Sequence, residues 1–296
     1  GDSTAVDDVS VSFPPGSTGL LGANGAGKSS LIKGLLGLVP LSSGSAEIFG
    51  VDITSDPREV RRSVGYMPED DCLIPGLTGI GMVQYAGELC GMSSRDAMQR
   101  GHEVLCLTGL GEARYRKVET YSRGMKQRVK LAQALVHDPE VLFLDEPTSG
   151  MDPRGRLEML DLIQYIAGQE KMSIVLATHI LVDVERICGN VVMINRGRVV
   201  KEAGMDDLRG DYSEAYTVRV DRERDRLREV LEGRGCGVEE GIRQDLEVTL
   251  PAGEGPRVIL EAAEEAGARL RKMVSSIQTL EDVFVKTLGE DQDAGI

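Results

Sequence analysis

The sequence predicts an α/β protein, with a mainly parallel β-sheet covered by helices and a small α+β domain after it. Short apolar segments alternate with helical segments up to about residue 205, as is typical of parallel sheets. A glycine-rich segment, Gly22 to Ser29, lies between an expected strand and an expected helix. From residue 206 the order becomes strand, helix, strand, strand, helix, strand, which is the order of ferredoxin-like units. We therefore expect two domains, residues 1–205 and 206–296.

The elements of the first domain follow from hydrophobic periodicity. Val9, Val11 and Phe13 alternate with polar residues and predict a half-buried strand. Further strands are expected at 19–21, 46–49, 64–67, 141–144 and 174–177, and helices at 29–38, at 123–136 and from Pro153 onward. In the last of these helices, Leu157, Leu160 and Ile163 are expected to share one face.

A mainly helical subdomain is expected at about residues 75–135. Apolar residues recur there at roughly helical spacing, and Ser93 with Asp96 forms a capping box at the start of one helix. In the second domain, strands are expected at 216–220, 238–242, 246–250 and 270–274, and helices at 224–231, 258–266 and 280–288.

Composition excludes several classes of protein. The chain has 34 Lys and Arg against 48 Asp and Glu, a formal net charge of -14, which disfavours binding to nucleic acid. Its five cysteines are widely spaced, without a Cys-x-x-Cys pair, and fit reduced thiols better than disulfides or a zinc site. No apolar run approaches the ~20 residues of a membrane-spanning helix. We expect a chain that does not itself cross a membrane.

The first chemical motif is a phosphate-binding loop. The pattern G-x-x-x-x-G-K-[ST] is fulfilled by Gly22, Ala23, Asn24, Gly25, Ala26, Gly27, Lys28 and Ser29, with Ser30 directly after it. Glycines let backbone N–H groups turn toward phosphate oxygens, and the following helix N-terminus adds positive potential. Lys28 is expected to reach the β- and γ-phosphates of ATP, and the Ser29 hydroxyl to ligate Mg²⁺.

The second motif is an apolar strand that ends in two carboxylates. Val141 to Leu144 leads to Asp145 and Glu146, at the sheet edge where open α/β sheets bind ligands. Asp145 is expected to hold Mg²⁺, directly or through water. Glu146 is placed to orient the water that attacks the γ-phosphate, or to accept its proton.

Together these segments resemble the nucleotide-binding subunits of ABC transporters. The resemblance covers Val9 to about Val200 and adds three further segments in the order of that family: Tyr121-Ser122-Arg123-Gly124-Met125, Ser149-Gly150-Met151-Asp152 and Thr178-His179. It implies the RecA-like fold of phosphate-loop NTPases, with an antiparallel β edge and a helical subdomain.

The resemblance also implies roles for residues and a second subunit. Two subunits, expected to be identical, would close head to tail on two ATP molecules. Ser122, Arg123, Gly124 and Met125 would then face the ATP bound by the partner. By the same resemblance Glu146 is the catalytic base, His179 contacts the γ-phosphate, and Ser149 with Asp152 belongs to the segment that links the two sites.

Departures from the common family pattern include the signature segment, which reads Tyr-Ser-Arg-Gly-Met in place of Leu-Ser-Gly-Gly-Gln, and position 69. Arg123 stands where glycine is usual in the signature segment, and Glu69 stands where many members have glutamine. A glutamate can still ligate Mg²⁺ through oxygen, so we expect Glu69 to join Ser29 and Asp145 at the metal.

The ending Ser276 to Phe284 is similar to the multidrug, antibiotic and sodium exporters, whose ATPase and permease are separate chains. We therefore expect a peripheral ATPase on the cytoplasmic face of a cell membrane, bound to a permease. One alternative is an ABC-type ATPase that acts on ribosomes or DNA. It is disfavoured by the single nucleotide domain, by the absence of a long coiled-coil segment and by the net charge. Another is a small-molecule kinase, which does not explain Tyr121 to Met125.

Overall fold

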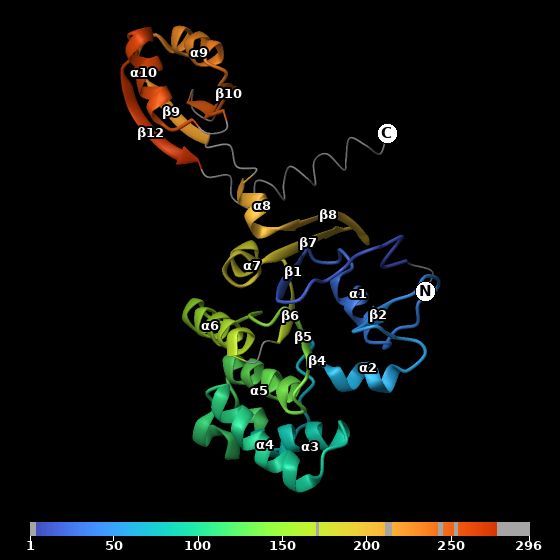
Figure 1. The fold of residues 1–296 in the computed structure, drawn as a ribbon. Coiled ribbons are helices and arrows are strands. Elements are labelled where there is room, and N and C mark those ends of the chain that lie inside the picture. The colour runs from blue at the N-terminus through green and yellow to red at the C-terminus, as the bar shows by residue number, and fades with distance from the viewer. Residues whose placement is uncertain (1–3, 170–171, 211–214, 242–244, 252–253, 277–296) are drawn as a thin grey trace. The chain divides into compact units, whose positions relative to one another are not determined.

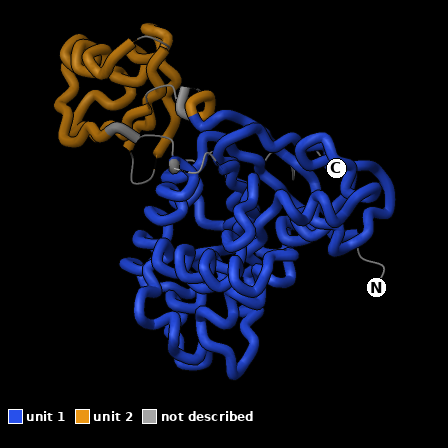
Figure 2. Tube along the Cα trace, turned by 60° about the horizontal axis from the view of Figure 1, so that its bottom comes forward, with its two compact units in different colours: residues 1–205 blue, residues 206–296 orange. Residues whose placement is uncertain are grey.

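The computed structural model describes residues 4–169, 172–210, 215–241, 245–251 and 254–276. The chain divides into two compact units, Gly1–Met205 and Asp206–Ile296, which are coloured separately in Figure 2. Each unit has its own hydrophobic core. Within the described ranges, no helix is long and apolar enough to span a bilayer.

A six-stranded sheet organises the first unit (Figure 1). Its strands, in the spatial order β4-β5-β6-β1-β7-β8, are Val64–Met67, Val141–Asp145, Ser173–Thr178, Ser17–Leu21, Asn190–Asn195 and Arg198–Gly204. All neighbours run parallel except β8, which is antiparallel to β7. A separate two-stranded sheet consists of β2 and β3, Glu47–Ile48 and Val51–Asp52. The predicted mainly parallel sheet with an antiparallel edge is confirmed.

In the described residues, the helices of this unit are α1 to α7: Lys28–Leu35, Pro57–Ser63, Gly79–Leu89, Ser94–Leu107, Arg123–Leu135, Pro153–Gln169 and Leu181–Ile187. Helix α8, Met205–Gly210, begins at the last residue of this unit and continues into the second. Short 3₁₀ helices cover Gly111–Tyr115 and Val118–Thr120. Helices α3, α4 and α5 pack on one another and form the helical subdomain. The predicted capping box is present, because the Ser93 hydroxyl accepts from the Asp96 N–H at 3.1 Å and donates to its carboxylate at 2.7 Å.

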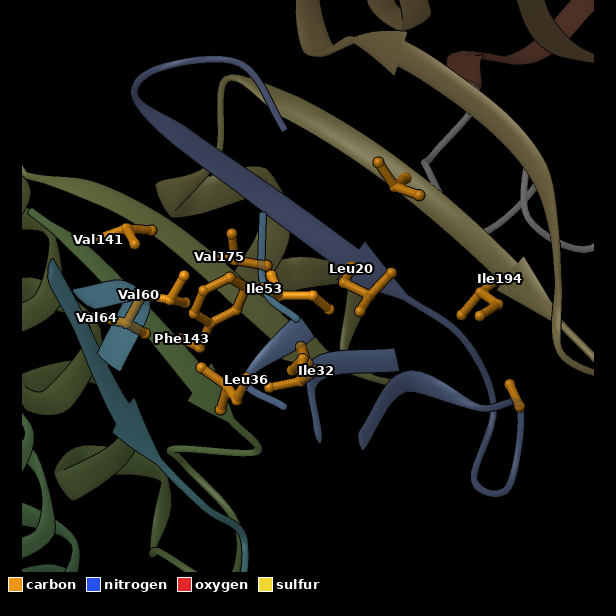
Figure 3. Packing of buried hydrophobic residues seen from close by; sticks show 13 residues of the cluster. Leu20, Ile32, Leu36, Ile53, Val60, Val64, Val141, Phe143, Val175 and Ile194 are labelled. Carbon is orange, nitrogen blue, oxygen red and sulfur yellow. The ribbon is translucent and has the colours of Figure 1, made fainter. Parts of the chain in front are cut away.

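The core beneath the glycine-rich loop holds the sheet and α1 together (Figure 3). Leu20, Phe143 and Val175 of the sheet share this cluster with Ile32 and Leu36, from α1 and its C-terminal end. All five residues of β5 are buried, as expected for a central parallel strand. Each apolar side chain among them contributes about 1.5–3 kcal/mol when it is fully buried. The strand ends that carry the polar residues are thereby fixed by packing.

Two predictions about this unit were wrong. Residues 9–13 form no strand, although Val11 and Phe13 do pack against the core. The alternation of side chains is satisfied by packing of Val11 and Phe13 on the core without pairing to a neighbouring strand. Leu157 is 48% exposed while Leu160 and Ile163 are buried, because at 100° per residue it points away from the face they share.

After α8, the described residues of the second unit form an antiparallel sheet packed with α9 and α10. In chain order its elements are β9 Ala215–Val220, α9 Arg224–Gly233, β10 Gly237–Glu240, β11 Leu246–Thr249, α10 Arg257–Ala266 and β12 Leu270–Ser276. The strand order is β10-β11-β9-β12 with every neighbour antiparallel. Its core includes Val218, Leu231 and Ile259. The predicted helix 280–288 and nearly all of the tail segment 276–284 lie outside the described residues, as does Ile242 of the predicted strand 238–242.

Candidate nucleotide-binding site

The loop between β1 and α1 has the geometry that phosphate binding needs. Gly25 and Gly27 have φ angles of 81° and 109°, which L side chains rarely adopt. A Cβ on Gly22 would lie 2.5 Å from the Ile194 carbonyl oxygen, and one on Gly27 would lie 2.6 Å from the Ala5 carbonyl oxygen. Because α1 begins at Lys28, its N-terminal amides face the same space as the loop. An anion is therefore favoured there.

This space is a cavity of about 360 Å³. It is lined by Ala5, Asn24, Gly25, Gly27, Lys28, Ser29, Ser30, Glu69, Asp145 and Glu146. Gly22, Ala23 and Ala26 belong to the same loop but do not line the cavity. The loop, the end of β5 and the segment after β4 thus converge on one cavity, as the sequence motifs predict.

Lys28 is held at the cavity by the loop itself. Its side chain is 6% exposed, and its Nζ donates to the Gly22 carbonyl at 2.7 Å and the Ala23 carbonyl at 3.2 Å. The same Nζ lies 3.7 Å from Glu146 Oε1. A buried ammonium needs such partners. Phosphate oxygens offer a stronger, charged alternative to the two carbonyls.

Asp145 ends β5 with its carboxylate almost fully buried, at 2% exposure. Burial raises the pKa of Asp145 above its ordinary value; a hydrogen bond from Ser29 opposes this, and the charges of Glu69 and Glu146 add to it. Its Oδ1 is buried without a hydrogen-bond partner. An unpaired carboxylate oxygen beside a serine hydroxyl suits a hard cation such as Mg²⁺. In the described part of the chain no group of three His, Cys, Asp or Glu residues could hold a metal ion.

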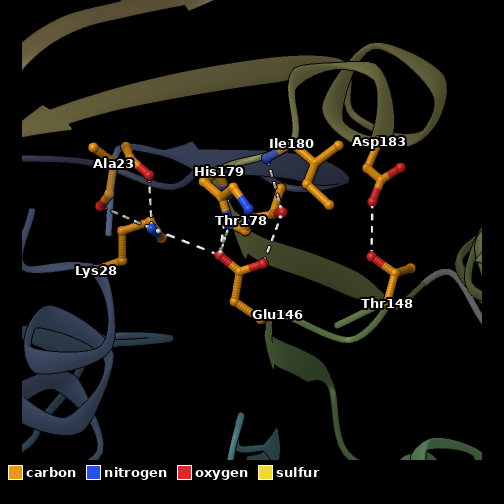
Figure 4. A network of polar contacts seen from close by, with 9 residues as sticks. Ala23, Lys28, Glu146, Thr148, Thr178, His179, Ile180 and Asp183 are labelled. Carbon is orange, nitrogen blue, oxygen red and sulfur yellow. Dashed lines mark hydrogen bonds and ion pairs between the residues drawn. The ribbon is translucent and has the colours of Figure 1, made fainter. Parts of the chain in front are cut away.

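Glu146 adopts a strained backbone conformation beside His179 (Figure 4). Its φ is 49°, in the left-handed region, where strain in a non-glycine residue is often functional. Its carboxylate accepts from the Thr178 hydroxyl at 3.1 Å and from the His179 N–H at 3.0 Å, and lies 2.8 Å from His179 Nδ1. These contacts form because β5 and β6 are adjacent in the sheet.

The signature residues lie outside this cavity. Ser122 is exposed at the N-cap of α5, and its hydroxyl accepts from the Met125 N–H at 3.4 Å. Arg123 Nε lies 3.4 Å from the Ser149 carbonyl oxygen, and a Cβ on Gly124 would lie 3.3 Å from the Met151 methyl group. The segments 122–125 and 149–152 therefore contact each other but are not brought to the cavity of their own chain.

Helix α5 also holds the segment that carries Glu69. Lys126 Nζ forms an ion pair with Asp71 at 2.8 Å, and Lys130 Nζ donates to the Glu69 carbonyl at 2.8 Å. Lys130 is 2% exposed, and burial lowers its pKa. The position of Glu69 in the cavity thus depends on the helix that follows Ser122.

Two further residues, Ala5 and Thr178, contribute to this region without a role predicted from the sequence. Ala5 lines the cavity from an irregular segment, and no sequence pattern points to it. Thr178 was noted only as the residue before His179, yet its hydroxyl orients Glu146. A threonine that ends a buried strand next to a candidate histidine is the signal that could have singled it out.

Comparison with known proteins agrees with this geometry. The ABC transporter family profile matches residues 6–149. The ABC transporter ATP-binding protein sll0415 of Synechocystis is 34% identical over 293 residues, covering 95% of this chain and 78% of that protein. The doxorubicin resistance ATP-binding protein DrrA of Mycobacterium tuberculosis is 33% identical over 296 residues, covering 96% and 88%.

The similarity to ABC transporter proteins is also seen in the fold, by comparison with solved structures. The cbiO1 protein of Clostridium perfringens, part of the ABC transporter complex cbiONQ, matches with a TM-score of 0.62 and 28% identity, over 69% of this chain and 83% of that one. These relatives do not favour an ABC-type ATPase that acts on ribosomes or DNA. The cavity, the conformation of the loop and these relatives lead to one conclusion: the chain is an ATP-binding, ATP-hydrolysing subunit of the ABC transporter family.

Proposed function

We propose that this chain powers a membrane exporter as one of two identical ATPase subunits, each bound to a permease at the cytoplasmic face of the membrane. One observation carries the proposal: the nucleotide cavity and the exposed Ser122–Met125 segment are both present, but they are separate within one chain. A second copy would supply its signature segment to this cavity. The similarity to doxorubicin resistance ATP-binding proteins supports export as the direction of transport.

In this proposal Mg²⁺ is held by Ser29, Asp145 and Glu69, and when bound it neutralises phosphate charge. Lys28 leaves the loop carbonyls and contacts the β- and γ-phosphates. Glu146 orients the attacking water and accepts its proton, and His179 contacts the γ-phosphate. These roles explain why the strained Glu146 lies within 4 Å of both Lys28 and His179.

The signature and linking segments act between subunits. The backbone and hydroxyl at Ser122, Arg123, Gly124 and Met125 would face the γ-phosphate bound by the partner, since a helix N-terminus attracts an anion. Ser149 and Asp152 would connect the two sites, because Ser149 already contacts Arg123 and Gln127 of the signature helix. ATP would close the two copies, and hydrolysis would reopen them.

A groove of about 340 Å³ supports permease docking. It is lined by Leu36, Leu38, Arg61, Val64, Tyr66, Pro68, Cys72, Ala86, Leu89, Cys90, Lys130, Gln133, Ala134 and His137. Most of these side chains are apolar, and the charged ones are basic, so a short permease segment with apolar and acidic residues would fit. The groove borders the segment that carries Glu69, which would transmit closure to the permease.

The test uses the natural thiols of the groove. Cys72 and Cys90 line it, whereas the exposed Cys106 does not. In membranes that contain the transporter, a thiol-to-amine cross-linker on Cys72 or Cys90 is expected to capture a chain with several membrane-spanning helices. Leu89, 71% exposed, allows a charge to be introduced, and Leu89→Glu should abolish the adduct.

Met98, on α4 and 36% exposed outside the groove, provides the matched control, and Met98→Glu should leave the adduct intact. Cross-linking only through Cys106, or capture of ribosomal proteins in place of a membrane protein, would contradict the proposal.

A further inference from the structure

A buried carboxylate lies next to the catalytic region without touching it. Asp183 of α7 is 1% exposed, and a buried charge is costly unless it is fully paired. Its Oδ1 accepts from Arg156, with Nε at 2.8 Å and Nη2 at 2.6 Å. Its Oδ2 accepts from the Thr148 hydroxyl at 2.9 Å. Three elements, the turn after β5, α6 and α7, therefore meet at one carboxylate.

The same two segments of chain are connected twice (Figure 4). The first connection is at Glu146, whose carboxylate lies 2.8 Å from His179 Nδ1 and also accepts from the His179 N–H and the Thr178 hydroxyl. The second joins Thr148, two residues after Glu146, to Asp183, four residues after His179. Contacts at two places along the chain fix the orientation of the turn relative to the helix more firmly than contacts around Glu146 alone.

The two connections differ in their exposure. The His179 side chain is 47% exposed, and Glu146 lines the cavity, so this contact is open to exchange with a nucleotide. Thr148 is 3% exposed, Asp183 is 1% exposed, and neither lines the cavity. Arg156 covers the remaining oxygen of the carboxylate. The second connection can therefore persist while the first is broken.

We propose that Thr148, Asp183 and Arg156 form a positioning network, which keeps the Glu146 turn and the His179 segment in register while Glu146 and His179 change partners during ATP hydrolysis. The proposal rests on the roles proposed above for Glu146 and His179. None of the three residues lines the cavity, so each would act by positioning Glu146 and His179.

The principal test compares Thr148→Val with Thr148→Ser. Valine keeps the shape but removes the hydroxyl, whereas serine keeps the hydroxyl that binds Asp183. We expect Thr148→Val to lower kcat about tenfold, because a small misplacement of catalytic groups is costly, with KM for ATP little changed. Thr148→Ser should restore kcat. A Thr148→Val protein with normal kcat would overturn the proposal, whatever its melting temperature.

A second measurement separates positioning from general stability. Thr148→Val is combined with His179→Ala. If Thr148 acts through the Glu146–His179 pair, its effect on kcat should largely disappear once His179 is absent. If the two effects on kcat multiply in full, Thr148 acts elsewhere and the proposal is wrong.

The matched control is Asp161→Asn. The ion pair between Arg186 and Asp161, 2.6 Å long, also links α7 to α6, but it is 39% and 58% exposed and does not involve the turn. Asp161→Asn should leave kcat unchanged, and an equal loss in this variant would refute a role specific to Thr148. Glu146→Gln is measured in parallel. If it retains full turnover, the roles proposed for the site fail; if it is inactive while Thr148→Val is normal, only the positioning network fails.

Discussion

At the scale of single residues, the site consists of groups whose backbone conformation or burial costs free energy. Glu146 has a φ of 49°, and such a conformation costs about 1–2 kcal/mol for a residue with a Cβ. It is retained because the Glu146 N–H donates to the Ala177 carbonyl at 2.9 Å and the carboxylate contacts Thr178, His179 and Lys28. The surrounding strands compensate for this strain and burial. They hold the carboxylate in position for the attacking water.

Removing the charge of Glu146 should stop turnover but not binding. We expect Glu146→Gln to lower kcat by roughly a hundredfold or more, since the amide cannot accept a proton. ATP affinity should remain, because the Gln oxygen can still accept from the His179 N–H while its amide N–H donates to the Thr178 hydroxyl. Phosphate release and nucleotide binding measure the two effects. Glu158→Gln, on an exposed face of α6, should behave as the native protein. Normal hydrolysis by Glu146→Gln would exclude Glu146 as the base.

The negative charge of Asp145 is expected to lower the stability of the fold while it supports ATP hydrolysis. Its folded-state pKa is raised by burial, so the ionised side chain disfavours folding above that pKa, and this penalty is relieved as pH falls through it. Asp145→Asn should therefore raise the melting temperature of the nucleotide-free protein at pH 7, by about 2–4 °C, and abolish Mg²⁺-dependent hydrolysis. The difference in melting temperature should shrink toward acidic pH. A lower melting temperature for Asp145→Asn at pH 7 would show that the charge is stabilising.

At the scale of elements, the phosphate loop and α1 form one structural unit with β7. Gly22 approaches the Ile194 backbone so closely that no side chain fits. The conformation of the loop therefore depends on a neighbouring strand as well as on its own glycines. The helix that follows begins at Lys28, where its free N–H groups are available to phosphate.

Replacing a glycine by alanine should lower the free energy of unfolding in the phosphate loop and raise it at an exposed position of a helix. Gly22→Ala would place a Cβ 2.5 Å from the Ile194 carbonyl oxygen, and we expect a loss of about 1–3 kcal/mol in the free energy of unfolding, together with weakened ATP binding. Gly168 lies in α6, and a Cβ on this residue would meet no atom within 4 Å. Gly168→Ala should therefore stabilise by about 0.5–1 kcal/mol. Denaturant titration compares the two, and equal effects would exclude the close backbone approach as the cause.

At the scale of the whole molecule, the chain contains two cores. The core of residues 1–205 contains the cavity and the strand ends, and that of residues 206–296 is formed by the antiparallel sheet, α9 and α10. Because each core buries its own apolar surface, damage to one need not unfold the other.

Leu231 tests this independence. It is 0% exposed in the second core, and Leu231→Ala should cost about 2–5 kcal/mol. Hydrogen exchange is expected to accelerate in residues 215–276 and not around the cavity, with ATP binding unchanged. Leu260 of α10 is 52% exposed, so Leu260→Ala should change stability by less than about 0.5 kcal/mol. Loss of ATP binding in Leu231→Ala would show that the units are coupled.

Pairing of two chains is tested at the signature helix. Ser122→Arg adds bulk and charge at an exposed N-cap outside the chain's own cavity. We expect ATP to bind each chain normally but no longer to drive dimer formation, as measured by light scattering with Mg²⁺ and ATP in a Glu146→Gln background. Ser94→Arg places the same change at the exposed start of α4 and should leave dimers intact. Unaltered dimers of Ser122→Arg would contradict the shared site.

The predicted elements that the structure confirms are those encoded by local patterns. The glycine loop, the apolar strand before Asp145 and the helix that begins after Ser122 each depend on residues close in sequence. Local periodicity specifies local hydrogen bonds and the buried side of an element. Prediction failed where one residue pattern is compatible with two structures. Val11 and Phe13 are partly buried without forming a strand, and Leu157 lies on the exposed face of its helix.

The sequence by itself therefore determined the mainly parallel sheet, the phosphate loop and the chemical class of the site. Only the tertiary structure decided which polar groups meet. Glu146 and His179 are 33 positions apart, and Thr148 and Asp183 are 35 apart. These pairs form because β5 and β6 are neighbours in the sheet. The order of strands results from packing over the whole unit, and no short pattern of residues contains it.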